Sequence, residues 1–354
     1  MNTVIINSIG TATPGASKVL SDALKVPQDY MLKLLYNAPS ILFQKVDNET
    51  ALKAEDTLTK LGLDIAICKE DEKIDLTTEL VDISVQLNDV LKLPKVVDQL
   101  ADFLGCKPSE VLNLLLKEPS IVLGNVSVAT AKALENRIDA NVHFSNPRKD
   151  KYTILISNEE SLRAVNNIEK SLRSTAYLKD NVYVIENISY DDSQLFWRKH
   201  QSKKTIKLLN QSHQTVSLLL NDFNLEDTNH VSFLVEKVGM PEAILEDVHS
   251  ALPIVLIDGV NNNKATNFQK ECNEIGLTTS IEKDFNFKKK LHIQNISTSE
   301  IADVHRILHQ FISKENLPKA GAKEWISTDE MPTIIAKYLA VQLEILACNV
   351  EIIN

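Results

Sequence analysis

Two histidines in the C-terminal part of the chain have the spacing of a pair of metal ligands. His305 and His309 stand four residues apart in ADVHRILHQF, so on a helix both side chains would lie on one face. A zinc site needs a third protein ligand and usually a carboxylate that orients it. The neighbours Arg306 and Gln310 supply neither. We therefore predict no metal site and no cofactor.

Basic runs beside aromatic residues could bind nucleic acid, because rings stack on bases while cations contact phosphates. Such runs also fit solvated linkers or strand edges that lysine protects. The net charge of −10 disfavours a polyanion as the main partner, so nucleic acid is an alternative only. The predicted basic patch consists of Arg198, Lys199, Lys203 and Lys204 in WRKHQSKK and of Lys288, Lys289 and Lys290 in FNFKKK.

No group of residues has the spacing of a catalytic site. The stretch GTATPGASK, residues 10–18, carries glycines, hydroxyls and a lysine but lacks the GxxxxGK[ST] spacing of a phosphate-binding loop. Carboxylate pairs such as Glu55 and Asp56 fall on expected helix faces. No Ser/His/Asp or Cys/His arrangement has a supporting local spacing. We predict that the protein is not an enzyme.

The composition is typical of a folded protein of the cytoplasm. Hydrophobic residues make up 44% and charged residues 24% of the chain. Four scattered cysteines without a CxxC pair indicate reduced thiols. The apolar runs are shorter than the roughly 20 residues that a membrane helix needs, and no basic leader opens the sequence. We expect a cytoplasmic protein without membrane insertion.

A short apolar turn recurs along the chain. It reads NAPSILFQKV from residue 37, KEPSIVLGNV from residue 117 and SALPIVLIDGV from residue 250. Residues 27–67 align without a gap on residues 241–281, and nine positions are identical. Such self-similarity is the sequence signature of repeated structural units.

The conserved positions of the repeat correspond to helix and strand boundaries. Pro27 and its counterpart Pro241 suit the start of a helix. Asp47, Ser127 and Asn261 are preferred N-cap residues for the helix after the turn. Gly62 and Gly276 suit its end. Each unit is therefore expected to run strand, helix, helix, strand, helix, strand, which is a small α+β sandwich of the type βααβαβ.

We predict that the chain consists of tandem copies of this sandwich. In the third copy, TIKLLN at residues 205–210 is expected to be the first strand. In the last, degenerate copy, Ser327 or Asp329 is expected to cap a helix that runs to Leu346. The predicted boundaries are 1–70 for unit 1, 71–147 for unit 2, 148–200 for a partial strand-helix-strand unit or linker, 201–285 for unit 3 and 286–354 for unit 4.

The stretch KVLSDALKVPQDYMLKLLYNAPSILFQKVDNETALKAEDTLTKLGLDIAICK resembles the C-terminal domain of the bacterial ribosomal stalk protein. The family shows the same helix ending in an AP turn, a capped helix start, a charged helix, a glycine and a short strand. The same superfamily fold serves the adaptor that delivers N-degron substrates to Clp proteases. The resemblance implies a domain that binds proteins and catalyses nothing.

The surface that recruits translation factors in the stalk family is changed in this chain. Pro27, Gln28 and Asp29 replace the family's glycine-lysine run, and Ser21 and Phe43 stand at positions where the family carries positive charge. Among the positions that are basic in the family, only Lys18 keeps a positive charge in this chain. Losing these charges weakens attraction to an acidic factor.

We therefore predict a non-catalytic protein-interaction or scaffold protein, a structural or adaptor component of a larger bacterial assembly. The alternatives are a substrate-delivery adaptor of the Clp type and a nucleic-acid-binding protein. Contacts are expected on the proline-started helices, at Gln28, Tyr30, Lys33, Glu110, Asn113, Glu242, Glu246 and His249.

Overall fold

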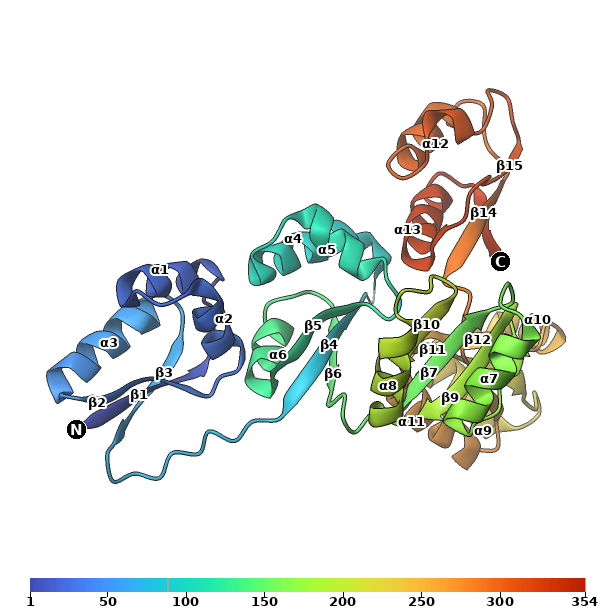
Figure 1. Ribbon diagram of the computed structural model, residues 1–354. Helices are drawn as coiled ribbons and strands as arrows, with labels where there is room; N and C mark the ends of the chain where they lie inside the picture. The colour runs from blue at the N-terminus through green and yellow to red at the C-terminus, as the bar shows by residue number, and fades with distance from the viewer. Residues whose placement is uncertain (88, 354) are drawn as a thin grey trace. The chain divides into compact units, whose positions relative to one another are not determined.

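The structure, a computed structural model, describes residues 1–87 and 89–353 (Figure 1). The chain forms two compact bodies. The large body comprises Met1–Asn146 and Phe287–Asn354, and the small body comprises Pro147–Asn286. Five small sheets, each with its own helices, make up the described residues. We call these parts segments A to E in chain order; A, B and E belong to the large body, C and D to the small one.

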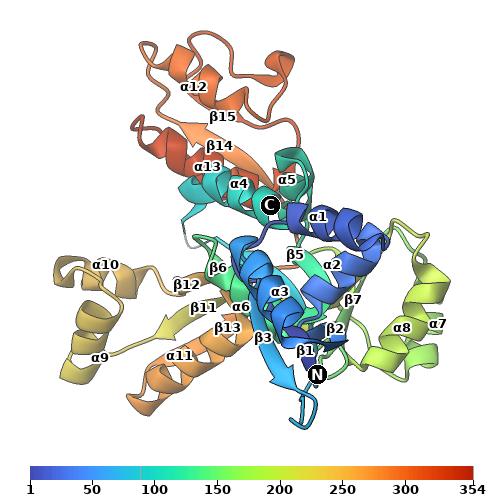
Figure 2. The ribbon, with the colours of Figure 1, turned by 90° about the vertical axis from the view of Figure 1, so that its left-hand side faces the viewer.

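Segment A has the element order that the sequence predicts, and its first strand lies in the middle of an antiparallel sheet ordered β2-β1-β3. Helices α2 and α3 cover one face of this sheet (Figure 2). The elements are β1 (Asn2–Ser8), α1 (Gly15–Leu24), α2 (Gln28–Tyr36), β2 (Ser40–Val46), α3 (Asn48–Lys60) and β3 (Asp64–Lys69).

Segment B repeats this order, with the sheet β5-β4-β6. A single hydrophobic core contains buried residues of segments A, B and E. The elements are β4 (Leu80–Gln86), the 3-10 turn η1 (Val90–Lys92), α4 (Leu93–Leu104), α5 (Pro108–Leu115), β5 (Ile121–Ser127), α6 (Val128–Glu135) and β6 (Asn141–Ser145).

Segment C has one helix where segments A and B have two, and an added edge strand gives the sheet order β10-β7-β9-β8. Both helices pack on one face of this sheet around Ile154 and Ile156. The elements are β7 (Tyr152–Ser157), α7 (Leu162–Leu172), β8 (Tyr177–Lys179), β9 (Val182–Ile188), α8 (Tyr190–His200) and β10 (Ile206–Asn210).

Segment D has the sheet order β12-β11-β13 and its own core around Leu218 and Leu220. Its elements are the 3-10 turn η2 (Gln211–His213), β11 (Thr215–Asp222), α9 (Thr228–Ser232), the π-helical turn η3 (Phe233–Lys237), the 3-10 turn η4 (Glu242–Ile244), α10 (Leu245–Ser250), β12 (Ile254–Asn261), α11 (Asn262–Glu274) and β13 (Thr278–Glu282).

Segment E also has its first strand in the centre, between β15 and β16 on one side and β17 on the other. Its elements are β14 (Lys288–Gln294), α12 (Ile301–Leu308), the 3-10 turn η5 (Lys314–Asn316), β15 (Glu324–Ile326), β16 (Met331–Pro332), α13 (Thr333–Glu344) and β17 (Asn349–Ile353).

The helix caps read from the sequence are confirmed. The Asp47 side chain accepts a hydrogen bond from the Thr50 backbone N–H. The Ser127 and Asn261 side chains likewise accept one from the backbone N–H three residues later, at Thr130 and Lys264. These bonds satisfy N–H groups that a helix start leaves free. Gly62 and Gly276, with φ of +90° and +88°, follow the helices in the left-handed conformation that glycine adopts most easily.

The recurring proline turn has the same backbone geometry in segments A, B and D. The peptide bonds before Pro39, Pro119 and Pro253 are all cis. Six residues after each proline, the chain is left-handed at Lys45, Asn125 and Gly259, where the strand register shifts in a bulge. Left-handed residues also stand fourteen positions before each proline, at Lys25, Gly105 and Gly239.

The predicted α+β class is confirmed, and two predicted details are wrong. The strand within TIKLLN, Ile206–Asn210, is β10, which pairs with β7 of segment C, whereas the first strand of segment D is β11. In segment E neither Ser327 nor Asp329 caps the helix, because α13 begins only after Pro332. The Ser327 hydroxyl instead accepts a hydrogen bond from the Leu291 backbone N–H.

Candidate interaction surfaces

The predicted contact residues on the proline-started helices are exposed in three separate segments. Gln28, Tyr30 and Lys33 lie on α2, and 53% of the Tyr30 side chain is accessible. Glu110 and Asn113 are exposed on α5. Glu242 lies on η4, and Glu246 and His249 on α10. Each of these helices therefore carries its own group of the predicted residues.

Three of these side chains also make contacts within their own segment. The Glu110 carboxylate accepts a hydrogen bond from the Lys107 backbone N–H and completes the cap of α5. Gln28 donates to the Ser17 hydroxyl at 3.3 Å. The His249 ring meets the Phe223 ring edge-on, with centroids 5.3 Å apart. Tyr30 and Lys33 are thus the better candidates for a partner contact on α2.

The opposite end of α2 is occupied by segment B. The Tyr36 hydroxyl donates to the Phe103 carbonyl oxygen at 3.2 Å, and the Thr130 hydroxyl of α6 donates to the Tyr36 carbonyl oxygen at 2.7 Å. Burial raises the pKa of Tyr36 to about 12; nearby Arg137 opposes this shift and Cys106 adds to it. A neutral phenol is therefore kept at the junction of the two segments.

Arg137, just after α6, is the central side chain of this junction. Its guanidinium donates to the Ala12 carbonyl oxygen at 2.8 Å and lies 4.9 Å from the centre of the Phe103 ring. The Asp102 carboxylate is 3.5 Å away, and only 18% of the Arg137 side chain is exposed. Charge-assisted bonds of this kind are stronger than neutral ones and fix one geometry. Segments A and B are thus held in one arrangement.

Sequence reasoning missed the Arg137 junction. The arginine and its acceptor Ala12 are 125 residues apart, so no local spacing relates them. The available signal lay in α6 itself, whose sequence VATAKALE is apolar where the corresponding helix α3 reads NETALKAE. A helix that is apolar on more than one side is expected to be covered on more than one side.

The predicted basic patch is divided between the two bodies. Arg198 and Lys199 are exposed in the last turn of α8, where cations complement the helix dipole. Lys203 and Lys204 follow in the next turn, and Lys203 pairs with Glu160 at 3.1 Å. Hydrogen bonds from Thr205 and Lys203 lower the pKa of Glu160.

Lys288, Lys289 and Lys290 lie on β14 of segment E. Successive strand residues point to opposite faces, and Lys289 is accordingly only 8% exposed. The run KKK therefore does not form one basic surface. The α8 residues of the predicted patch belong to the other body.

The histidine pair does not point to a metal. His305 Nε2 lies 2.8 Å from the Pro318 carbonyl oxygen, and His309 Nδ1 lies 3.2 Å from that of Ile312. Within residues 1–87 and 89–353, no group of three or more His, Cys, Asp or Glu side chains is arranged to hold a metal ion. In the stretch GTATPGASK, residues 10–14 connect β1 to α1 and residues 15–18 begin α1. The Thr11 N–H of this connection donates to the Gly62 carbonyl oxygen at 2.8 Å.

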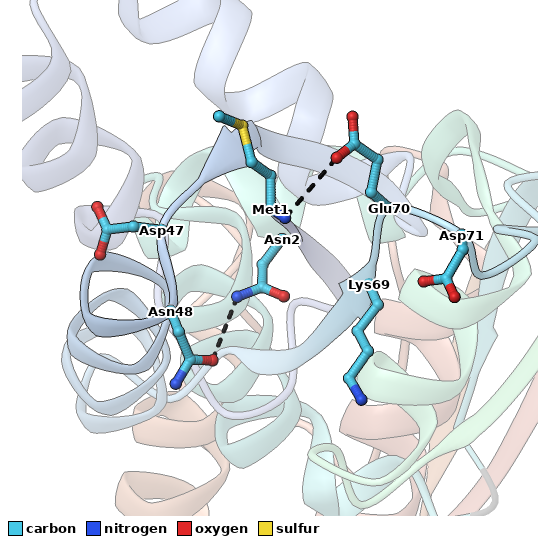
Figure 3. A pocket seen from close by; sticks show the side chains of 7 residues that line it. All are labelled: Met1, Asn2, Asp47, Asn48, Lys69, Glu70 and Asp71. Atoms are coloured by element: carbon cyan, nitrogen blue, oxygen red, sulfur yellow. Dashed lines mark hydrogen bonds and ion pairs between the residues drawn. The ribbon is translucent and has the colours of Figure 1, made fainter.

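A shallow, open pocket lies at one end of the sheet of segment A (Figure 3). Several of its polar groups have partners nearby. Hydrogen bonds from Thr50 lower the pKa of Asp47, and Asn2 donates to Asn48 at 3.2 Å. The amino group of Met1 lies 3.7 Å from Glu70.

In the part of the chain that the structure describes, every helix is too short or too polar to cross a lipid bilayer. The chain matches no family model, no curated protein and no solved structure.

Proposed function

We propose that the protein is a non-catalytic scaffold built from tandem sandwiches that resemble the ribosomal stalk C-terminal domain. One observation supports the proposal above the others. Each of the five segments has its own small sheet in which the first strand is flanked on both sides, yet the segments expose different side chains. A copied shape with changed exteriors is expected when each copy binds a different surface. Fold alone does not determine function, so the exposed faces carry the proposal.

The exposed side chains of the proline-started helices differ in charge and shape. Helix α2 presents Tyr30 and Lys33, whereas η4 and α10 present Glu242 and Glu246. Side chains of such different chemistry suit different partners. Joining several weak sites in one chain raises the overall affinity for an assembly that offers all the partners at once. A structural or adaptor role in a larger assembly is thus the function that these surfaces support best.

The proposal is tested by affinity purification of the tagged full chain from lysate at low salt, followed by mass spectrometry. We expect a reproducible set of co-purifying proteins. The double variant Tyr30→Ala, Lys33→Ala should lose at least one of them, because it removes the exposed anchor and charge of α2. The matched control Glu49→Ala, Lys53→Ala on α3 should keep the whole set. Identical sets for both variants would move the contact away from α2, and no reproducible partner would contradict the scaffold role.

A further inference from the structure

In each of the five segments, one helix comes directly before the last strand of the sheet and has the same place in the element order. These helices are α3, α6, α8, α11 and α13. On each helix, the third, sixth and tenth residues, counted from the first helical residue, lie in a line along one side. We call this line the stripe of the helix. In α6 the stripe is Thr130, Ala133 and the following Arg137, and both Thr130 and Arg137 contact segment A.

The chemistry of the sixth position differs with the surroundings of the helix. It is Ala133 in α6 and Tyr338 in α13, which are 7% and 6% exposed. Helix α6 contacts β1 of segment A, and α13 contacts η1 of segment B. The sixth position is the exposed, polar Lys53 in α3 and Asn267 in α11. The sixth residue is therefore apolar in the covered stripes of α6 and α13 and polar in the solvated stripes of α3 and α11.

Helix α8 combines an apolar sixth position with exposure. Its stripe is Asp192, Leu195 and Lys199, and 57% of Leu195 is accessible. Lys199 stands at the position of Arg137 in α6, and Arg198 adds a second exposed cation. The stripe of α8 thus carries the leucine and the cation of a docking face, and within the described residues of its own body it stays exposed where the stripe of α6 is covered.

The surface that receives α6 is the connection after the first strand, together with the end of α2. In segment A it supplies the carbonyl oxygens of Ala12 and Tyr36. The same connection in segment D follows β11, where Leu225 is 37% exposed and Glu226 is exposed beside it. His249 and Ser250, exposed at the end of α10, stand where segment A has the end of α2.

The charges of segments C and D are complementary. Residues 147–210 contain twelve Lys and Arg against eight Asp and Glu, a net charge of +4. Residues 211–286 contain four against twelve, a net charge of −8. Opposite charges on two surfaces speed their encounter and select one orientation.

We propose that two copies of this chain associate through the α8 stripe of one copy and the connection after β11 of the other. Leu195 would meet Leu225, Lys199 and Arg198 would meet Glu226, and Asp192 would face His249. The two surfaces are different, so the contact is heterologous, and a pair of copies keeps one free surface of each kind. Association then continues into open chains. This inference goes beyond the scaffold role and does not rest on it.

Sedimentation velocity of the full chain tests the proposal. At low salt the average sedimentation coefficient should rise with protein concentration up to about 100 µM, where a contact with a Kd of about 10 µM is largely formed. Added salt should reverse the rise. Leu195→Asp and Leu225→Asp should each remain monomeric, because every contact needs both surfaces. Both side chains are exposed, and circular dichroism checks that the variants fold.

An equal mixture of the two monomeric variants gives the decisive result. Leu225→Asp keeps an intact α8 stripe and Leu195→Asp an intact connection, so the mixture should form dimers and nothing larger. The control Lys53→Asp, at the sixth position of the solvated α3, should associate as the wild type does. A wild type that stays monomeric, a mixture that does not dimerise, or a Leu195→Asp variant that still associates would each overturn the proposal.

Discussion

Helices α3 and α6 have the same place in neighbouring segments but differ in their outward side. In α3 the stripe residues Thr50 and Lys53 are exposed. In α6 the corresponding Thr130 and Ala133 are buried, and Thr130 donates a hydrogen bond to segment A. The inward side is alike, since Ala51 and Ala131 are both fully buried against their sheets. The fold thus sets the inner face, and the presence of a neighbour sets the outer one.

This comparison shows where sequence changes are tolerated. An outward position on α3 is a solvated surface, where most substitutions change stability little. The same position on α6 belongs to a packed and desolvated junction. Identical substitutions at the two positions should therefore have very different effects, and the following predictions use this difference.

The largest effect is expected from placing a charge in the junction. Ala133→Glu would bury a carboxylate between Thr130 and Arg137 on the stripe, and we expect the free energy of unfolding to fall by about 3 kcal/mol. Lys53→Glu, the matched change on α3, should lower it by less than about 0.5 kcal/mol. Urea denaturation followed by circular dichroism measures both. Equal losses would show that the outer side of α6 is not a covered face.

A smaller effect is expected from removing the central cation. Arg137→Met keeps much of the side-chain volume but leaves the Ala12 carbonyl oxygen without its donor, so we expect a loss of about 2 kcal/mol. Arg306→Met is a suitable control, because Arg306 is 75% exposed and pairs with Asp303 on its own helix. If both variants lose the same stability, Arg137 is an ordinary surface residue.

The smallest effect is expected from the phenol of Tyr36. Tyr36→Phe removes one hydrogen bond to the Phe103 carbonyl oxygen and should lower the free energy of unfolding by about 1 kcal/mol. Because folding raises the pKa of Tyr36 from its usual value to about 12, the wild-type junction keeps its full stability below pH ~10 and loses it as the pH rises toward 12. Burial and Glu186 also raise the pKa of Tyr177 to about 12. A tyrosinate absorbance titration should therefore show two late-ionising tyrosines in the wild type and one in Tyr36→Phe.

Local features of the fold could be predicted from the sequence because neighbouring residues determine them. The caps at Asp47, Ser127 and Asn261 and the glycine at residue 62 depend on groups within a few positions. Strand pairing, in contrast, depends on residues that are far apart in the sequence. Residues 206–210 read as a strand, but only pairing with β7 assigns them to segment C.

The junction of segments A and B was beyond local reasoning for the same reason. Arg137 is one of many charged residues in the sequence, and its role follows from Ala12 and Phe103, which lie far from it along the chain. The candidate helices could be located because prolines start them. Which end of each helix is free could not be predicted, since a distant segment covers one end of α2.

The large body is discontinuous in sequence, since the chain leaves it after Asn146 and returns at Phe287. During translation segment B therefore leaves the ribosome long before α13 of segment E, which contacts η1, has been made. The nascent large body stays incomplete while the entire small body is synthesised. During this interval the part of the shared core that segment E supplies is missing, and incompletely packed chains of this kind are prone to aggregate.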